Sequence, residues 1–294
     1  MSDETLPLVS VVIPAKNEGD NVRTTIESSL NAKTRYPYEI IVVDDGSTDN
    51  CCNLIAPHVD GEKIKLIATP GIGAAPARNL GAEHANGTYL IFCDAHLTFE
   101  DYWIDGLIEL MRSGLADAVS PGIASSTQPS LVGYGQTLNA KLGIKWNHHQ
   151  NRPTPCAILP GGCLAVKRDV FSDIGGFDRG FRVWGFEDIE ISIKMWLFGY
   201  KCYVQPAVKV LHLFRHVHPY EVTYDHVYYN MLRMAYSHFN ESRIKACKNL
   251  IVHGDRAQIE RQVLEGGAVE QRLRYFGRRK YDDNWFMKWF KIPF

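Results

Sequence analysis

The sequence predicts an α/β protein built on a mostly parallel sheet, and three observations support this prediction. Four short runs of apolar, β-rich residues are typical of buried strands, at 9–13, 38–43, 64–68 and 89–93. Segments suited to helices separate these runs, and strands that are apolar throughout indicate a parallel sheet covered on both faces. Clusters of polar residues follow the strands, which is where ligands bind in such folds.

The first half of the chain alternates strands and helices in order. Pro14 stops the first strand, and a helix is expected over 20–30. The second strand is broken by the acidic turn 44–49, whose residues are suited to capping a following helix. After the third strand, a glycine-rich loop leads into a helix over 74–85, and the fourth strand follows it.

The second half has a different pattern. A segment rich in Gly, Ser, Thr, Asn and His, about 121–155, is expected to form a mobile loop on the acceptor side of a site. A hairpin-like pair, 201–204 and 208–211, brings His212 to its end, and the sequence after residue 224 has a helical pattern. The remaining expected elements are a strand over 116–120 and helices over 101–112 and 187–198.

Composition narrows the class of protein. With 294 residues, 45% of them hydrophobic and 22% charged, the chain is typical of a globular protein with a substantial core. The net charge of -1 argues against a general binder of nucleic acid or of anionic membranes, because such binders carry a broad basic surplus. No G-x-G-x-x-G follows the first strand, so a dinucleotide-binding loop is not expected.

Several features predict a cytoplasmic setting. The seven cysteines are odd in number, scattered and without C-x-x-C spacing, which indicates a reducing compartment and no zinc site. Cys93 and Cys163 lie in apolar surroundings and are expected to be buried thiols. Segment 1–5 is acidic and lacks the pattern of a secretory signal, and no apolar stretch is long enough to cross a bilayer.

The fourth strand ends abruptly in Asp94-Ala-His96. On an extended backbone these two side chains leave on the same side, which suits the binding of a divalent cation. Taken alone, the pair has a simpler explanation, since many strands end in an Asp that caps the next turn. Further polar clusters, at 17–18 and 44–45, also fall at strand ends, and this coincidence is more informative than any one cluster.

At this point the residues resemble a known family. Segments 9–18, 40–49 and 77–81 resemble family-2 nucleotide-sugar glycosyltransferases of the GT-A fold, a Rossmann-like, mostly parallel sheet. The later segments 184–192 and 212–220, together with the D-x-H at residue 94, resemble the catalytic domains of polypeptide N-acetylgalactosaminyltransferases. The resemblance covers roughly residues 8 to 240. It implies a GT-A catalytic domain over 1–222 and a helical C-terminal extension over 223–294.

The resemblance also implies a metal and a donor site. Asp94, His96 and His212 would hold the metal, and their imidazole ligands favour Mn²⁺ over Mg²⁺. The donor would be a UDP-sugar, with Asp45 or Asp44 accepting a hydrogen bond from the base. The residues implied to contact this donor are Pro14, Ala15, Glu18, Asp44, Asp45, Arg78, Asp94, Ala95, Gly162, Trp184, Arg215, His218 and Tyr220.

Roles within that donor site follow from the same match. Pro14 and Ala15 would line the base pocket, and Arg78 would support the nucleotide side. Arg215, His218 and Tyr220 match a loop that closes over the pyrophosphate. For two further residues, two explanations stay open. Trp184 would offer a flat face to a sugar or act as a lid, and Gly162 would permit close approach to the donor sugar or form an ordinary turn.

Two neighbouring carboxylates are the predicted catalytic residues. Asp188 or Glu187 would act as the base, although both could simply begin a helix, where carboxylates suit the dipole. Asp188 stands where the retaining peptide transferases carry Asn, and inverting family-2 enzymes use an Asp as base. Inversion with Asp188 is therefore favoured over retention. Phe186 replaces a Gly and Gly71 an Arg of the peptide transferases, so the donor sugar stays open.

The predicted function is a glycosyltransferase, a hexosyl- or N-acetylhexosaminyl-transferase, acting on an acceptor hydroxyl or thiol. The acceptor would be a peptide, a glycan or a small molecule, and nucleic acid is not expected as a partner. The rival from another class is a non-catalytic nucleotide- or carbohydrate-binding module, which would need no base. The aromatic tail 285–294 is expected to dock on its own domain or on another subunit of a homo-oligomer. Peripheral membrane contact is the alternative for this tail.

Overall fold

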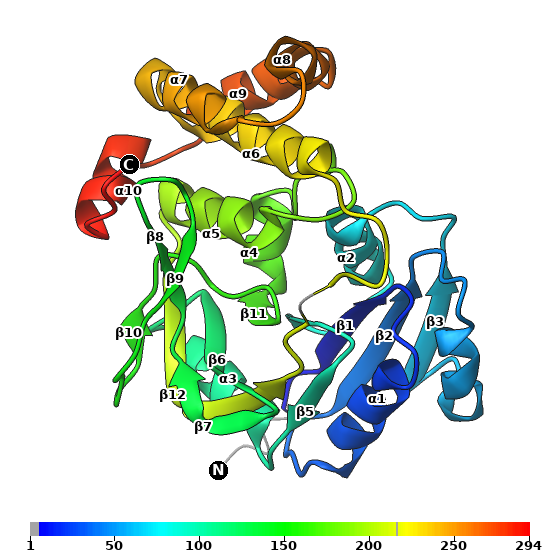
Figure 1. Ribbon diagram of the computed structural model, residues 1–294. Helices are drawn as coiled ribbons and strands as arrows, with labels where there is room; N and C mark the ends of the chain where they lie inside the picture. The colour runs from blue at the N-terminus through cyan, green and yellow to red at the C-terminus, as the bar shows by residue number, and fades with distance from the viewer. Residues whose placement is uncertain (1–5, 216) are drawn as a thin grey trace.

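The computed structural model describes residues 6–215 and 217–294 (Figure 1). Segment 1–5, on which the prediction about a secretory signal rests, and His216 lie outside these described residues. Four parallel strands in the order β3-β2-β1-β4 form the first half of the main sheet. All four predicted strands are confirmed, as β1 (Val9–Ala15), β2 (Tyr38–Asp44), β3 (Ile64–Ala68) and β4 (Tyr89–Cys93).

Helices cover both faces of this sheet, as predicted. On one face, α1 (Asn21–Asn31) and α3 (Trp103–Arg112) share a core with alternate strand residues such as Val11 and Ile13. On the other face the core joins the intervening Val12 to α2 (Ala74–Glu83), α4 (Arg168–Asp173) and α5 (Glu187–Phe198). This alternation is the two-residue period of strands that are buried on both sides.

Two local features fit the helices to the sheet. Gly81 lets α2 lie close on β1 and β2, because an added Cβ would come within 2.3 Å of Val12 Cγ1. The acidic turn after β2 is followed by a short 3-10 helix, η1 (Cys51–His58), which contains Pro57. Asp49 accepts a hydrogen bond from the backbone N–H of Cys51 at its start.

The second half of the sheet is mixed. Strand β11 (Cys163–Lys167) runs antiparallel between β4 and β6 (Ala118–Ser125), and β12 (Cys202–His212) is parallel to β6. Short strands complete the edges, and a separate hairpin lies beside them. These are β5 (Leu97–Phe99), β7 (Gln128–Gly133) and β10 (Thr154–Pro155), with β8 (Gln136–Leu138) and β9 (Ile144–Trp146) forming the hairpin.

The structure corrects two predictions in this region. The predicted mobile loop over 121–155 is wrong, because most of this segment pairs in β6 to β10. The predicted hairpin over 201–211 is wrong as well, since β12 is a single strand along β6. Its register shifts between Gln205 and Lys209, so the residues around Pro206 form an irregularity within the strand rather than a turn. His212 still ends the strand, as expected.

Five helices follow the sheet and form an outer layer (Figure 1). They are α6 (Tyr224–His238), α7 (Glu241–Leu250), α8 (Arg256–Glu265), α9 (Ala268–Phe276) and α10 (Asp283–Trp289). The division between residues 222 and 223 stays a prediction. None of the helices within the described residues combines the length and the apolar character that a membrane span needs.

The aromatic tail docks on the chain's own core, which was the favoured expectation. Phe286 and Met287 of α10 are buried, and Trp285 and Phe290 lie 6.3 and 5.1 Å from Trp196 of α5, measured between ring centroids. Trp289 remains 56% exposed. The apolar face of the tail is therefore largely used in packing against α5.

Candidate active site

A cavity of about 1250 Å³ opens at the carboxyl ends of β1, β2 and β4. The strand order reverses here, because β2 and β3 lie on one side of β1 and β4 lies on the other. Every predicted site residue except Asp44 lines this cavity: Pro14, Ala15, Glu18, Asp45, Arg78, Asp94, Ala95, His96, Gly162, Trp184, Glu187, Asp188, His212, Arg215, His218 and Tyr220.

Asp45 and Asp44 divide between two tasks. Asp45 is buried in the cavity wall, where its carboxylate accepts hydrogen bonds from the backbone N–H groups of Ile72 (2.6 Å) and Gly73 (2.9 Å) and from the Thr69 hydroxyl (2.8 Å). Asp44 instead accepts from the N–H of Ser47 at 2.9 Å and shapes the turn. Of the two carboxylates, only Asp45 can therefore meet a ligand in this cavity.

Three side chains at the floor of the cavity form a candidate metal site. Ligand atoms of Asp94, His96 and His212 lie within 4.8 Å of one another, although the residues come from the end of β4 and the end of β12. His212 Nε2 lies 3.2 Å from Asp94 Oδ2, close to the separation of about 3 Å between adjacent ligands of an ion with bonds of about 2.1 Å.

The donor set tests whether a cation fits. Two imidazoles and one carboxylate are a mixed nitrogen and oxygen set that suits a divalent transition metal better than Mg²⁺. Nε2 of His212 faces Asp94, whereas Nδ1 is buried and has no partner within the described part of the chain, so a cation bound at Nε2 would leave the ring proton on Nδ1. The three residues therefore fit a divalent cation.

Neighbouring charges keep Asp94 ionised. Burial opposes the charged form, but the hydrogen bond from His212 and the positive charge of Arg78 outweigh it and hold the pKa of Asp94 well below its usual range. Arg78 Nη2 donates to Asp94 Oδ1 at 2.9 Å. A carboxylate that is charged over the whole physiological range is what a metal ligand requires.

Glu18 joins two loops above the floor of the cavity. Its carboxylate lies 3.2 Å from Nδ1 of His96, which leaves Nε2 of that ring for a ligand, and it pairs with the guanidinium of Arg215. The contact connects the segment after β1 with the loop after β12. The sequence match implied donor contact for both residues, and in the structure each lines the cavity while holding the other.

The loop after β12 also brings His218 and Tyr220 to the cavity. Burial, helped by the nearby charge of Arg215, lowers the pKa of His218, so its imidazole is neutral at pH 7. The His218 ring lies 4.4 Å from the ring of Trp184, measured between centroids. His218 can therefore serve as a hydrogen-bond donor and a packing partner, whereas the positive charge of this loop belongs to Arg215.

The Trp184 loop, residues 182–186, has a strained backbone. Val183 (φ 48°) and Phe186 (φ 69°) occupy the left-handed region together with Gly185 (φ 109°). Such a conformation costs about 1–3 kcal/mol for each non-glycine residue, and a β-branched Val is least suited to it. Strain of this size persists only where the surrounding structure holds it, which marks the loop as a segment with a defined task.

The carboxyl pair at the start of α5 faces the same cavity. Asp188 Oδ2 accepts from the N–H of Gly161 at 3.2 Å, and burial, partly opposed by that bond, raises the pKa of Asp188. Glu187 accepts from the N–H of Gly185 at 2.9 Å, and burial raises its pKa to about 7 against the opposing charge of Arg78. The two neighbours thus sit in different environments, which is how acid and base roles are separated.

Two further residues qualify the predicted site. Glu190, one turn beyond Glu187, is wholly buried and pairs with Lys194 (3.2 Å) and His238 (2.7 Å). Its role is therefore to stabilise the packing of α5. Lys16 was missed, although it lines the cavity with its Nζ 4.0 Å from Asp45. Its position directly after the Pro-Ala that ends β1 was the available signal, since cations at this edge meet anionic ligands.

Comparison with known families places this architecture. The model described as "Glycosyl transferase family 2" matches residues 10–175, and the model described as "N-terminal domain of galactosyltransferase" matches residues 146–219. The fold and the site define a GT-A-type α/β protein. The chain belongs to glycosyl transferase family 2, because that family's model covers more than half of it.

Individual relatives agree with this placement. The chain is 33% identical over 235 residues to polypeptide N-acetylgalactosaminyltransferase 8 of Drosophila melanogaster, covering 72% of this chain and 39% of that protein. It therefore spans about two fifths of that relative's length. The crystal structure of GalNAc-T7 with UDP, GalNAc and Mn²⁺ superposes with a TM-score of 0.74 at 21% identity, over 97% of this chain and 57% of that one.

A bacterial structure has the same fold at lower similarity. S. aureus TarS 1-349, solved in complex with UDP-GlcNAc, superposes with a TM-score of 0.59 at 15% identity, over 96% of this chain and 78% of that one. At these identities both structural matches speak for the fold alone.

Proposed function

We propose that this chain is a metal-dependent glycosyltransferase that moves a sugar from a UDP-sugar to an acceptor hydroxyl or thiol. The main observation behind the proposal is that one cavity is lined both by Asp94, His96 and His212 and by the carboxyl pair of α5. Membership of glycosyl transferase family 2 supports it. The GalNAc-T7 structure, which contains UDP and Mn²⁺, supports the choice of nucleotide and ion.

The floor of the cavity would hold the donor's diphosphate. Asp94, His96 and His212 would bind Mn²⁺, or Mg²⁺ in its place, and the bound ion would stabilise the negative charge that grows on the departing diphosphate. Arg78 keeps Asp94 charged, and Arg215 brings a second positive charge to the same wall. Asp45, with Pro14 and Ala15 beside it, would receive the uracil.

Asp188 would remove the proton from the acceptor. Burial raises its pKa, which makes it a stronger base than an ordinary Asp. The N–H of Gly161 orients the carboxylate, and Trp184 covers the cavity near His218. A base that acts directly on the acceptor gives attack opposite the leaving group, so we propose inversion of the anomeric centre.

The acceptor would be a peptide or a glycan. The curated relatives are named polypeptide N-acetylgalactosaminyltransferases, which supports a peptide. The cavity is also lined by the β8–β9 hairpin and by α6, whose apolar side chains there include Leu142, Ile144, Trp146 and Met231. A reducing, cytoplasmic setting belongs to the proposal as well, since all seven cysteines are free thiols.

The test is a turnover assay. Purified protein with Mn²⁺ would receive UDP-GalNAc, UDP-GlcNAc or UDP-glucose with panels of peptides and glycans, and UDP release and NMR of the product would be followed. We expect acceptor-dependent UDP release and a product of inverted configuration. Binding without release under any pairing would instead identify a non-catalytic module, and a product of retained configuration would remove Asp188 from the base role.

A further inference from the structure

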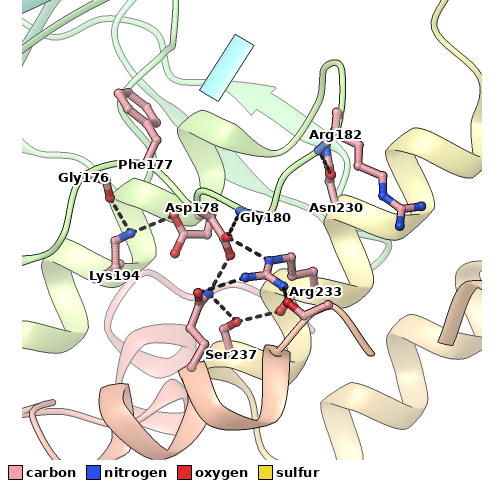
Figure 2. Close-up of polar contacts among 12 residues, drawn as sticks. Gly176, Phe177, Asp178, Gly180, Arg182, Lys194, Asn230, Arg233 and Ser237 are labelled. Atoms are coloured by element: carbon pink, nitrogen blue, oxygen red, sulfur yellow. Dashed lines mark hydrogen bonds and ion pairs between the residues drawn. The ribbon is translucent and has the colours of Figure 1, made fainter. Parts of the chain in front are cut away.

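The strained Trp184 loop is held by a residue from outside the matched sequence motifs. Asn230 lies on α6 in the helical C-terminal layer, is wholly buried and points at Arg182 (Figure 2). Its Oδ1 accepts from the N–H of Arg182 at 2.8 Å. Its amide nitrogen faces three carbonyl oxygens, of Arg182 (2.8 Å), Gly185 (3.0 Å) and Trp184 (3.3 Å).

These contacts satisfy the backbone where it departs from ordinary conformations. A carboxamide has two donors and one acceptor oxygen, and here all of them bind loop backbone. Without Asn230, the buried carbonyl of Gly185 would lose this partner, at a cost comparable to that of the strain itself. The N–H of Ala74 at the start of α2 also donates to the carbonyl of Val183 at 2.8 Å. Both α6 and α2 therefore hold the loop.

Helix α6 is itself fixed to the segment that precedes the loop (Figure 2). One turn beyond Asn230, the guanidinium of Arg233 donates to Asp178 (2.8 Å), to Gln271 (3.0 Å) and to the carbonyl of Gly266 (2.6 Å). Gln271 in turn donates to Asp178 at 2.6 Å and to the Ser237 hydroxyl at 2.9 Å. Because these groups are buried and hydrogen-bonded to one another, α6 holds Asn230 in a fixed position.

We propose that Asn230 is a positioning residue for the carboxyl pair and for Trp184, so that the C-terminal layer takes part in setting the active site. The loop runs directly into α5, and the N–H of Gly185 binds Glu187, so the path of the loop determines where both carboxylates point. Asn230 itself does not line the cavity. This proposal rests on the proposed function for its effect on transfer, and on geometry alone for its effect on the loop.

The direct test is amide hydrogen exchange of the full chain with Asn230→Ala. We expect the N–H groups of Arg182 and Ala74 to exchange at least about tenfold faster, while the amides within α6 stay protected. The N–H of Arg182 loses its acceptor on Asn230, and the N–H of Ala74 donates to the carbonyl of Val183 in the loosened loop. Asn230→Asp keeps the acceptor for the N–H of Arg182 but loses the donors, and it should loosen Ala74 as well.

Ser237→Ala is the matched control. Ser237 is buried on the same helix and bonds within the Arg233 network, and none of its hydrogen bonds within the described residues reaches the loop. With active protein, Asn230→Ala should lower kcat by about 10- to 100-fold with little change in UDP and Mn²⁺ affinity, and Ser237→Ala should not.

Two results would overturn the proposal: unchanged exchange at Arg182 and Ala74, or an equal change in Ser237→Ala at equal loss of stability. Failure of the proposed function would be recognised by a different observation: the wild-type protein would not bind UDP at all. The exchange result stands in either case.

Discussion

Asp188 and Glu187 are adjacent in sequence but face different partners. Asp188 receives a backbone hydrogen bond from Gly161, across the cavity wall, whereas Glu187 turns back onto Gly185 of its own loop. Both lie at the N-terminal end of α5, where the helix dipole favours negative charge. Burial acts against that charge and is the larger effect on both pKa values. The proposed function assigns proton removal to the Asp, because the Glu carboxylate is bonded back to its own loop.

Replacing Asp188 by Asn separates binding from transfer. The amide keeps the size of the side chain and an oxygen for the N–H of Gly161, but it cannot take up a proton. We expect UDP affinity in Mn²⁺ to change little and transfer to fall by about 10²- to 10⁴-fold. Calorimetry and a UDP-release assay on the same preparation measure the two quantities, and full activity of the variant would eliminate Asp188 as the base.

The raised pKa of Glu187 leads us to expect that the stability of the folded protein depends on pH. Its folded pKa of about 7 lies above its usual 4.5, so the unfolded chain loses its proton first as pH rises, and stability falls between these values. In metal-free protein, Glu187→Gln should therefore raise the free energy of unfolding by on the order of 3 kcal/mol at pH 8 and change it little at pH 4.

Glu190→Gln is the contrasting control for this experiment. The pKa of Glu190 is lowered, because Lys194 and His238 outweigh its burial, so its loss should destabilise the protein at pH 8. Urea unfolding at the two pH values decides the matter. A Glu187→Gln variant that is less stable at pH 8 than at pH 4, relative to wild type, would contradict the account.

Among single residues, the sequence predicted the identity of the site better than its internal contacts. Asp94 and His96 could be anticipated because a strand end and a spacing of two residues are local properties. His212, which is far from Asp94 in sequence (|i−j| = 118), was expected only through the family resemblance. The pairing of Glu18 with Arg215 could not, because nearly 200 positions (|i−j| = 197) separate them and only the folded sheet brings them together. The role of Asn230 could not be predicted either, since no sequence pattern distinguishes a buried Asn within a helix.

At the scale of elements, burial pattern decided what could be predicted. Strands β1, β2 and β4 are largely apolar and buried, and β3 is an apolar edge strand that is only partly buried. The bounds of all four agree with the sequence to within two residues. Strands β7 and β9 are short and largely exposed, so their composition resembles a loop. Strand β12 contains Pro206, which suggests a turn, yet pairing with β6 on both sides of it keeps the strand continuous.

Helix α10 should contribute strongly to stability. Phe286 is fully buried against the helices around α5, whereas Trp289 on the same helix is 56% exposed. We expect Phe286→Ala to lower the free energy of unfolding by about 3–5 kcal/mol, from lost burial and the cavity left behind.

Trp289→Ala provides the matched comparison and should cost less than about 1 kcal/mol, as an exposed position does. Urea denaturation of the two variants gives both values. Equal and small effects would mean that the tail does not belong to the core and would reopen the question of membrane contact.

At the scale of the whole molecule, the site lies where three layers meet. The sheet carries the candidate metal ligands at the ends of β4 and β12 and the proposed nucleotide side at the ends of β1 and β2. Helix α5 carries the carboxyl pair, and α6 holds the loop that leads into it (Figure 1). The helical C-terminal layer is thus continuous with the site rather than an appendage. The alternation of apolar strand runs with helical segments predicted the α/β class, but this arrangement depends on long-range contacts that no local pattern records.

In the proposed function, Asp94, His96 and His212 hold a divalent cation that binds the diphosphate of UDP. The decisive measurement is calorimetric titration of UDP into the purified protein, first with Mn²⁺ and then with EDTA. We expect binding that requires Mn²⁺ and that His212→Ala abolishes. Equal binding in EDTA, or unchanged manganese affinity in His212→Ala, would contradict the metal site, and the absence of any nucleotide binding would contradict the glycosyltransferase itself.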